Sequence, residues 1–223
     1  MGRSDIAAYC IFAAAVFDFF DGFAARLLKA YSPLGIQLDS LADMVSFGVA
    51  PAAILHKALL ANFASHFDGM TLLIISVVPF IVAVFSALRL AKFNIDTRQT
   101  DSFIGMPTPA CALLVASLAL GTSHGEGMAA LVMHSGWAVI AASVILSALL
   151  VSEIPMFSLK FKKQSSAAAF IKKYTVQLVF LVLCLLSPIF FGYTCIAVMI
   201  LLYIVISVVL WLVKPKKTSE AAK

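Results

Sequence analysis

The chain has 223 residues, of which 62% are hydrophobic and only 12% are charged, and its formal net charge is +5. A mean hydropathy of +1.04 excludes an ordinary soluble globular domain and places the chain in the membrane class. The strict alternation that a membrane β-barrel needs is absent. Long apolar runs therefore predict an all-α, polytopic transmembrane helix bundle among membrane lipids, with no nucleic-acid partner.

The apolar runs predict seven spans, of which the fourth is short. In chain order they are Ile6–Leu27, Leu38–Leu60, Thr71–Lys92, Pro107–Gly121, Met128–Val151, Tyr174–Phe191 and Tyr193–Val213. No composition break between them suggests a second domain, so we expect a single integral membrane domain over residues 1–213.

The basic residues predict the orientation of these spans, because Lys and Arg accumulate on the cytoplasmic side of short loops. If seven spans alternate, the basic residues gather on one face: Arg26, Lys29, Arg89, Lys92, Arg98, the lysines of residues 160–173 and the basic tail at 214–223. This places residues near 18–43 at the cytoplasmic side and residue 1 outside. We therefore expect a further span to precede the first one.

Aspartates interrupt the first two apolar runs. Asp18 and Asp21 are spaced i, i+3 and share one helical stripe with Gly22 and Ala25. Asp39 and Asp43 form an i, i+4 pair on the next helix. Because Ser32, Pro33 and Gly35 between them indicate a turn, we expect antiparallel helices whose acidic faces meet.

Four carboxylates packed together would repel one another, and the local positive charge comes only from Arg26 and Lys29. Oxygen ligands without Cys or His suit Mg²⁺ or Mn²⁺, and such ions would in turn hold phosphates. The small Gly22, Ala25 and Gly35 leave room for a nucleotide, and Arg26 offers a bidentate fork to a phosphate. Two other readings are ion-paired struts and a proton or ion relay in a transporter.

The spacing Asp18-x-x-Asp21-Gly22-x-x-Ala25-Arg26, eight residues, then Gly35-x-x-x-Asp39-x-x-x-Asp43 resembles the signature of the CDP-alcohol phosphotransferase family. The stretches "SPLGIQLDSLADMVSFGVAPA", "ALRLAKFN" and "FIGMPTPA" resemble its phosphatidylserine synthase branch. This resemblance runs from about residue 7 to residue 173, and the last two spans match only in being hydrophobic. The family normally carries another helix before the motif helix, which agrees with the expected preceding span.

The resemblance implies an enzyme that transfers a phosphatidyl group from CDP-diacylglycerol to L-serine, giving phosphatidylserine and CMP. It implies that Asp18, Asp21, Asp39 and Asp43 bind Mg²⁺ or Mn²⁺ and that Asp43 is also the catalytic base. The residues expected to contact CDP-diacylglycerol are Gly22, Ala25, Arg26, Ser32 and Gly35. The resemblance further implies a catalytic domain over residues 1–213 with its motif helices at 6–60, a homodimer, and a bacterial or archaeal inner membrane with the active site facing the cytoplasm.

A serine acceptor needs a cation for its carboxylate, and the third span supplies candidates at the same cytoplasmic level. Arg89 is the best candidate because it lies inside the span, and Asn94 is a second. The positive-inside rule alone would also explain these residues. Glycerol 3-phosphate or an inositol phosphate as acceptor, a transporter, and a catalytically silent homologue remain as alternatives.

Overall fold

The computed structural model describes residues 3–29, 32–95, 105–156 and 167–213, with side chains from residue 177 onward in the last range. Every long regular element in these ranges is a helix, which confirms the all-α prediction. The elements are α1 (Ser4–Leu28), α2 (Pro33–Asp43), the π-helix η1 (Met44–Val49), α3 (Ala50–Phe63), α4 (Gly69–Ser76), η2 (Val78–Phe80), α5 (Ile81–Ile95), α6 (Thr108–Ser123), α7 (Gly127–Met133), α8 (Gly136–Val151), α9 (Ala167–Phe191), η3 (Gly192–Thr194) and α10 (Cys195–Val213). The predicted basic loop at 160–173 and the tail at 214–223 lie outside the described side chains.

Each of the seven predicted spans corresponds to helical structure, but not each is one long helix. By length and composition, four stretches of the described chain could cross a membrane: Ser4–Leu28, Pro33–Phe63, Gly69–Ile95 and Gln177–Val213. A fifth results if the bent pair α7 and α8 counts as one span. The predicted fourth span is the shorter apolar helix α6. The last stretch holds two of the predicted spans, because α9 ends at Phe191 and α10 begins at Cys195.

Helix α6 lies at the centre of the fold, with α1, α3, α7 and α10 packed around it. Its buried side chains include Cys111, Ala112, Val115 and Ala116, each fully enclosed. Small side chains let helix backbones approach closely, which is the usual source of helix association in a membrane. The central helix can therefore be short and still hold the bundle together.

A bend of 86° separates α7 from α8, so the predicted span Met128–Val151 is broken. Ser135 caps α8 by accepting a hydrogen bond from the backbone N–H of Ala138. A Cβ atom on Gly136 would collide with the ring of Phe63 in α3. Gly136 therefore lets the first turn of α8 sit directly against α3.

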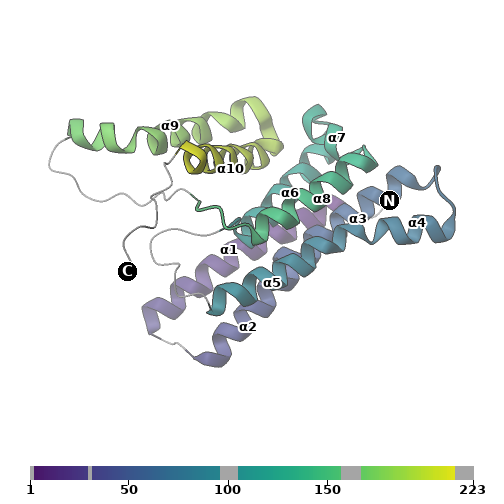
Figure 1. Ribbon diagram of the computed structural model, residues 1–223, viewed down its shortest axis with the longest axis horizontal. Coiled ribbons are helices and arrows are strands. Elements are labelled where there is room, and N and C mark those ends of the chain that lie inside the picture. Colours follow the sequence, from purple (N-terminus) through teal and green to yellow (C-terminus); the bar gives the residue numbers. More distant parts are fainter. Residues whose placement is uncertain (1–2, 30–31, 96–104, 157–166, 214–223) are drawn as a thin grey trace, which may run out of the picture.

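The hairpin of α9 and α10 is set beside the rest of the bundle (Figure 1) and contacts it through α6. Its η3 turn is held by Glu126, whose Oε1 accepts from the Tyr193 backbone N–H at 2.6 Å and whose Oε2 accepts from the Thr194 backbone N–H at 2.9 Å. The Thr194 hydroxyl also donates to Glu126, and the ring of His124 stacks on Tyr193. One polar contact set thus attaches the last two helices to the loop after α6.

Candidate active site

The carboxyl-terminal half of α1 and the carboxyl-terminal half of α2 carry the aspartates, and the end of α1 and the start of α2 lie at the same end of the bundle as the carboxyl end of α5 (Figure 1). Lys29 ends α1 in the left-handed conformation, with φ of 52°. Ser32 begins α2, because its Oγ accepts a hydrogen bond from the Gly35 backbone N–H at 3.0 Å, and Pro33 suits the first helical turn. α1 thus ends and α2 begins on either side of the position where the sequence predicts a turn.

Three of the four aspartates come together. One carboxylate oxygen from each of Asp18, Asp21 and Asp39 lies within 4.8 Å of the others. Asp18 is half-buried, whereas Asp21 and Asp39 are exposed. Because α1 packs on η1 and α3 but makes few contacts with α2, the two motif helices leave these carboxylates open to solvent and to a ligand.

The arrangement fits a divalent cation. The donor set is three carboxylates without sulfur or imidazole, as Mg²⁺ and Mn²⁺ prefer. Within the described part of the chain, the ion pairs are Arg3 with Asp5 and Lys92 with Glu153, so neither joins a basic side chain to this cluster. The reading as ion-paired struts therefore finds no partner among these residues.

Asp43 lies outside this group of three carboxylates. It is the last residue of α2, half-buried, and the π-helix η1 follows it directly. Its carboxylate interacts electrostatically with Asp18, Asp21 and Asp39, and also with Arg89 on α5. Short π-helical segments are frequent at functional sites. The roles of Asp43 as metal ligand and as base stay predictions.

Helix α5 packs against η1 and brings Arg89 to the site. Arg89 is only 8% exposed, and its Nη1 donates to Oγ1 of Thr108, the first residue of α6, at 3.3 Å. Its Cζ lies 6.0 Å from the centre of the Phe93 ring. Its Nε is buried and has no hydrogen-bond partner within the described chain. Arg89 is thus a buried cation near Asp43 whose Nε–H has no partner among the described residues.

The two glycines of the motif have different surroundings. A Cβ atom on Gly22 would meet nothing within 4 Å, so the predicted open space beside α1 is present. A Cβ on Gly35 would lie 3.0 Å from the Ser32 Oγ, so Gly35 serves the cap of α2. Arg26 is exposed, and its Nε donates to the Gly22 carbonyl at 3.0 Å. Ala25 lies half-buried on the same helix.

The side chain of Asn94, on α5, forms a hydrogen bond with α2. Its Nδ2 donates to the Ser40 Oγ at 2.9 Å, and Ser40 donates in turn to the Ile36 carbonyl at 3.1 Å. Residues 96–104, which include Arg98, lie outside the described residues. Sequence reasoning missed Ser40 and gave Thr108 no role, although the Pro-Thr-Pro run at 107–109 marked the position.

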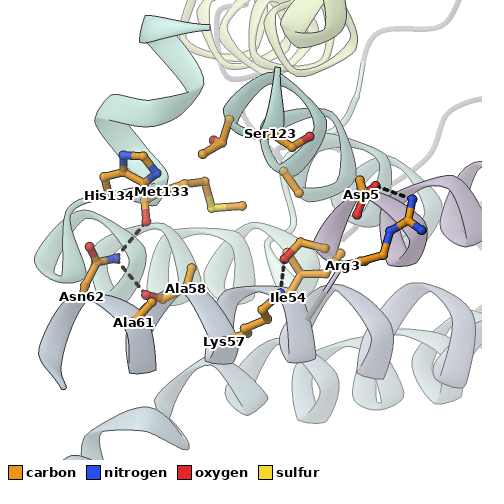
Figure 2. Close-up of a pocket in the computed structure, with 13 residues that line it drawn as sticks. Arg3, Asp5, Ile54, Lys57, Ala58, Ala61, Asn62, Ser123, Met133 and His134 are labelled. Carbon is orange, nitrogen blue, oxygen red and sulfur yellow. Dashed lines mark hydrogen bonds and ion pairs between the residues drawn. The ribbon is translucent and has the colours of Figure 1, made fainter. Parts of the chain in front are cut away.

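A separate cavity of about 670 Å³ lies between the first turn of α1 and helices α3, α6 and α7 (Figure 2). Its polar lining includes Arg3, Asp5, Lys57, Asn62 and His134. The cavity is lined by the amino-terminal end of α1, whereas the aspartates lie near the carboxyl-terminal end of that helix. It is therefore distinct from the carboxylate site.

A family model described as CDP-alcohol phosphatidyltransferase matches residues 1–149. The chain belongs to the CDP-alcohol phosphatidyltransferase family. All eight motif positions that suggested this family lie within the matched residues, and the prediction of the family is confirmed.

Three curated relatives within this family share one enzyme name. A protein of Helicobacter pylori named CDP-diacylglycerol–serine O-phosphatidyltransferase is 32% identical over 209 residues, covering 93% of this chain and 80% of that protein. A protein of Mycobacterium tuberculosis with the same name is 40% identical over 154 residues, covering 66% of this chain and 49% of that protein. One of Methanocaldococcus jannaschii, also with that name, is 43% identical over 105 residues, covering 47% and 46%. The chain thus spans four fifths of the first protein and about half of the other two.

The length of the first match corrects one expectation. A match over 93% of the chain reaches beyond residue 173, where the expected resemblance ends, although the family model itself matches only residues 1–149.

Proposed function

We propose that this chain transfers the phosphatidyl group of CDP-diacylglycerol to the hydroxyl of L-serine and releases CMP. The observation that carries the proposal is the group of carboxylates from Asp18, Asp21 and Asp39 within 4.8 Å of one another, with Asp43 and the buried Arg89 beside it. Membership of a phosphatidyltransferase family and the names of the curated relatives support the same reaction.

Asp18, Asp21 and Asp39 would hold Mg²⁺ or Mn²⁺, with Asp43 as an added ligand. A bound divalent cation would supply neutralisation of the charge that develops on the diphosphate. The side chains of the chain itself bind and orient the substrate. Gly22 leaves its side of α1 open for the nucleotide, and Ala25, Arg26, Ser32 and Gly35 line the approach to it.

In the proposed reaction, the serine hydroxyl oxygen attacks the phosphorus that bears the lipid. A new P–O bond forms to serine, the bond from that phosphorus to the CMP oxygen breaks, and CMP leaves with the electron pair. The Asp43 carboxylate accepts the hydroxyl proton. Asp43 serves as the base because it lies close to the reacting hydroxyl. Holding the nucleophile and the phosphorus in line provides much of the rate enhancement.

Arg89 is proposed to bind the serine carboxylate. A buried guanidinium with an unpartnered Nε favours an anionic ligand, since a buried donor without an acceptor is costly. The electrostatic interaction between Arg89 and Asp43 supports a site in which one small acceptor reaches both. Asn94 is proposed as a further polar contact at the edge of this site.

The proposed setting is the inner membrane of a bacterium or archaeon, with the site at the cytoplasmic face. Arg26, Lys29, Arg89 and Lys92 lie at the same helix ends as the aspartates, as the positive-inside rule predicts for that face. A homodimer is part of this proposal on the family resemblance.

The test is CMP release from CDP-diacylglycerol by the purified chain in detergent with Mn²⁺ or Mg²⁺. L-serine, glycerol 3-phosphate, an inositol phosphate and no acceptor are compared side by side. Release that depends on L-serine supports the proposal. Release only with another acceptor would assign a different alcohol to the same site, and no release with any acceptor would overturn the enzymatic reading.

A further inference from the structure

Thr108 begins the central helix α6 and is completely buried. Its Oγ1 accepts the hydrogen bond from Arg89 Nη1 at 3.3 Å. Pro107 precedes it in an extended conformation and brings no N–H of its own to the helix start. The hydroxyl of Thr108 is therefore turned to the interior of the bundle, where it meets a charged group.

The segment before Thr108 is fixed on the end of α8. The backbone N–H of Gly105 donates to the Ile154 carbonyl, and that of Met106 donates to the Leu149 carbonyl, each at 3.0 Å. The Met106 side chain is fully buried. Gly105 has φ of +74°, and a Cβ atom there would lie 2.7 Å from the Ser152 carbonyl oxygen. These contacts hold the start of α6, and with it the Thr108 oxygen, at one place relative to α8.

This fixed oxygen limits how the guanidinium of Arg89 can turn. A planar guanidinium whose Nη1 is held by a hydrogen bond presents its other N–H donors in fixed directions. One of them, Nε, is buried without a partner in the described chain. An unpaired buried donor on a charged group costs free energy that a bound anion would recover.

We infer that Thr108 is a positioning residue for acceptor selection: it orients Arg89 so that Nε–H receives a carboxylate on the acceptor alcohol. The inference rests on the proposed function and names the acceptor class as a hydroxy acid whose carboxylate lies close to its hydroxyl. An amino alcohol without a carboxylate, such as ethanolamine, forms no ion pair with Arg89, so its binding does not depend on how Arg89 is oriented.

The test compares Thr108→Val, Thr108→Ser and the wild type for kcat and KM with L-serine, KM with CDP-diacylglycerol, and residual release with ethanolamine. Valine keeps the shape of threonine and removes the acceptor oxygen, whereas serine keeps the oxygen. We expect Thr108→Val to raise the KM for L-serine roughly 10- to 100-fold, the usual cost of a hydrogen bond to a charged group. The KM for CDP-diacylglycerol and the ethanolamine rate should stay unchanged, and Thr108→Ser should restore the KM for L-serine.

The matched control is Thr122→Val, near the other end of the same helix, where the hydroxyl donates to the Leu118 carbonyl of its own helix. If Thr108→Val does not fold, Thr108→Ala against Thr108→Ser makes the same comparison. An unchanged KM for L-serine in an enzyme that uses serine overturns this inference and leaves the proposed function standing. A wild type without serine-dependent release overturns both.

Discussion

The amide of Asn94 donates from Nδ2 to the Ser40 hydroxyl at 2.9 Å, and this bond joins the last turn of α5 to α2 one residue after Asp39. The Ser40 hydroxyl in turn donates a hydrogen bond to the Ile36 carbonyl of its own helix. Helix α5 thus steadies the helix that brings Asp39 to Asp18 and Asp21.

This link predicts coupled effects of two substitutions. We expect Asn94→Ala and Ser40→Ala each to lower kcat for serine-dependent CMP release several-fold, because α2 then holds Asp39 less firmly. The double variant should lose little more than either single one, since residues in direct contact are not additive. Asn62→Ala, which removes an amide bonded to the Met133 carbonyl at the cavity, is the control. A rise in the KM for L-serine with Asn94→Ala but not with Ser40→Ala would support the proposed contact of Asn94 with serine, and an unchanged kcat in both variants would contradict the link.

The carboxylate cluster predicts dependence on a divalent cation. We expect Asp18→Asn, Asp21→Asn and Asp39→Asn each to weaken the apparent affinity for Mn²⁺ by at least about 100-fold, since even indirect partners of metal ligands cost 10- to 100-fold. The measurement is activity against free Mn²⁺ concentration. Asp68→Asn is the control, because Asp68 caps α4 by accepting from the Thr71 N–H and asparagine can do the same. Equal Mn²⁺ curves for all four variants would contradict the assignment.

Gly22 predicts opposite changes in stability and activity. Alanine in place of a glycine inside a helix stabilises the fold by about 0.5–1 kcal/mol, and nothing within 4 Å obstructs a Cβ there. We therefore expect Gly22→Ala to raise Tm while raising the KM for CDP-diacylglycerol, because the methyl group occupies the nucleotide's approach. Gly121→Ala is the contrast, since its Cβ would collide with Thr194 and Glu126 and should lower Tm. An unaltered KM in Gly22→Ala would remove Gly22 from the substrate path.

The hydrogen bonds of Glu126 to the η3 turn predict that the attachment of α9 and α10 loses stability in acid. Partial burial tends to raise its pKa, but the hydrogen bonds from Thr194 and Tyr193 outweigh this, and the pKa lies below the usual 4.5. A depressed carboxyl pKa adds stability above pH 4.5 that is lost as the pH falls through the folded pKa. Protection of α9 and α10 from hydrogen exchange, measured relative to the intrinsic exchange rate at each pH, should therefore fall below pH 4.5. Glu126→Gln should abolish that pH dependence, and an identical acid response in this variant would contradict the role of Glu126.

Local spacing was enough to predict the carboxylate site, because i, i+3 and i, i+4 positions share a helical face and Ser32 and Pro33 signal a helix start. The family signature rests on the same residues. What sequence reasoning missed depends on contacts between distant segments. An apolar run such as Met128–Val151 does not reveal the bend at Gly136, which the packing of Phe63 determines. The partner of Arg89 lies 19 residues away on another helix, and hydropathy carries no signal for that pairing.

The most direct test of the central claim is phosphatidylserine formation with equal CMP release by the wild type, Asp43→Asn and Asp68→Asn, all supplied with CDP-diacylglycerol, L-serine and Mn²⁺. The wild type and Asp68→Asn should each form phosphatidylserine and CMP in equal amounts. Asp43→Asn should give neither product, because its amide cannot accept the serine proton. Full product formation by Asp43→Asn would contradict the assigned base, and absence of phosphatidylserine from the wild type would contradict the proposed reaction itself.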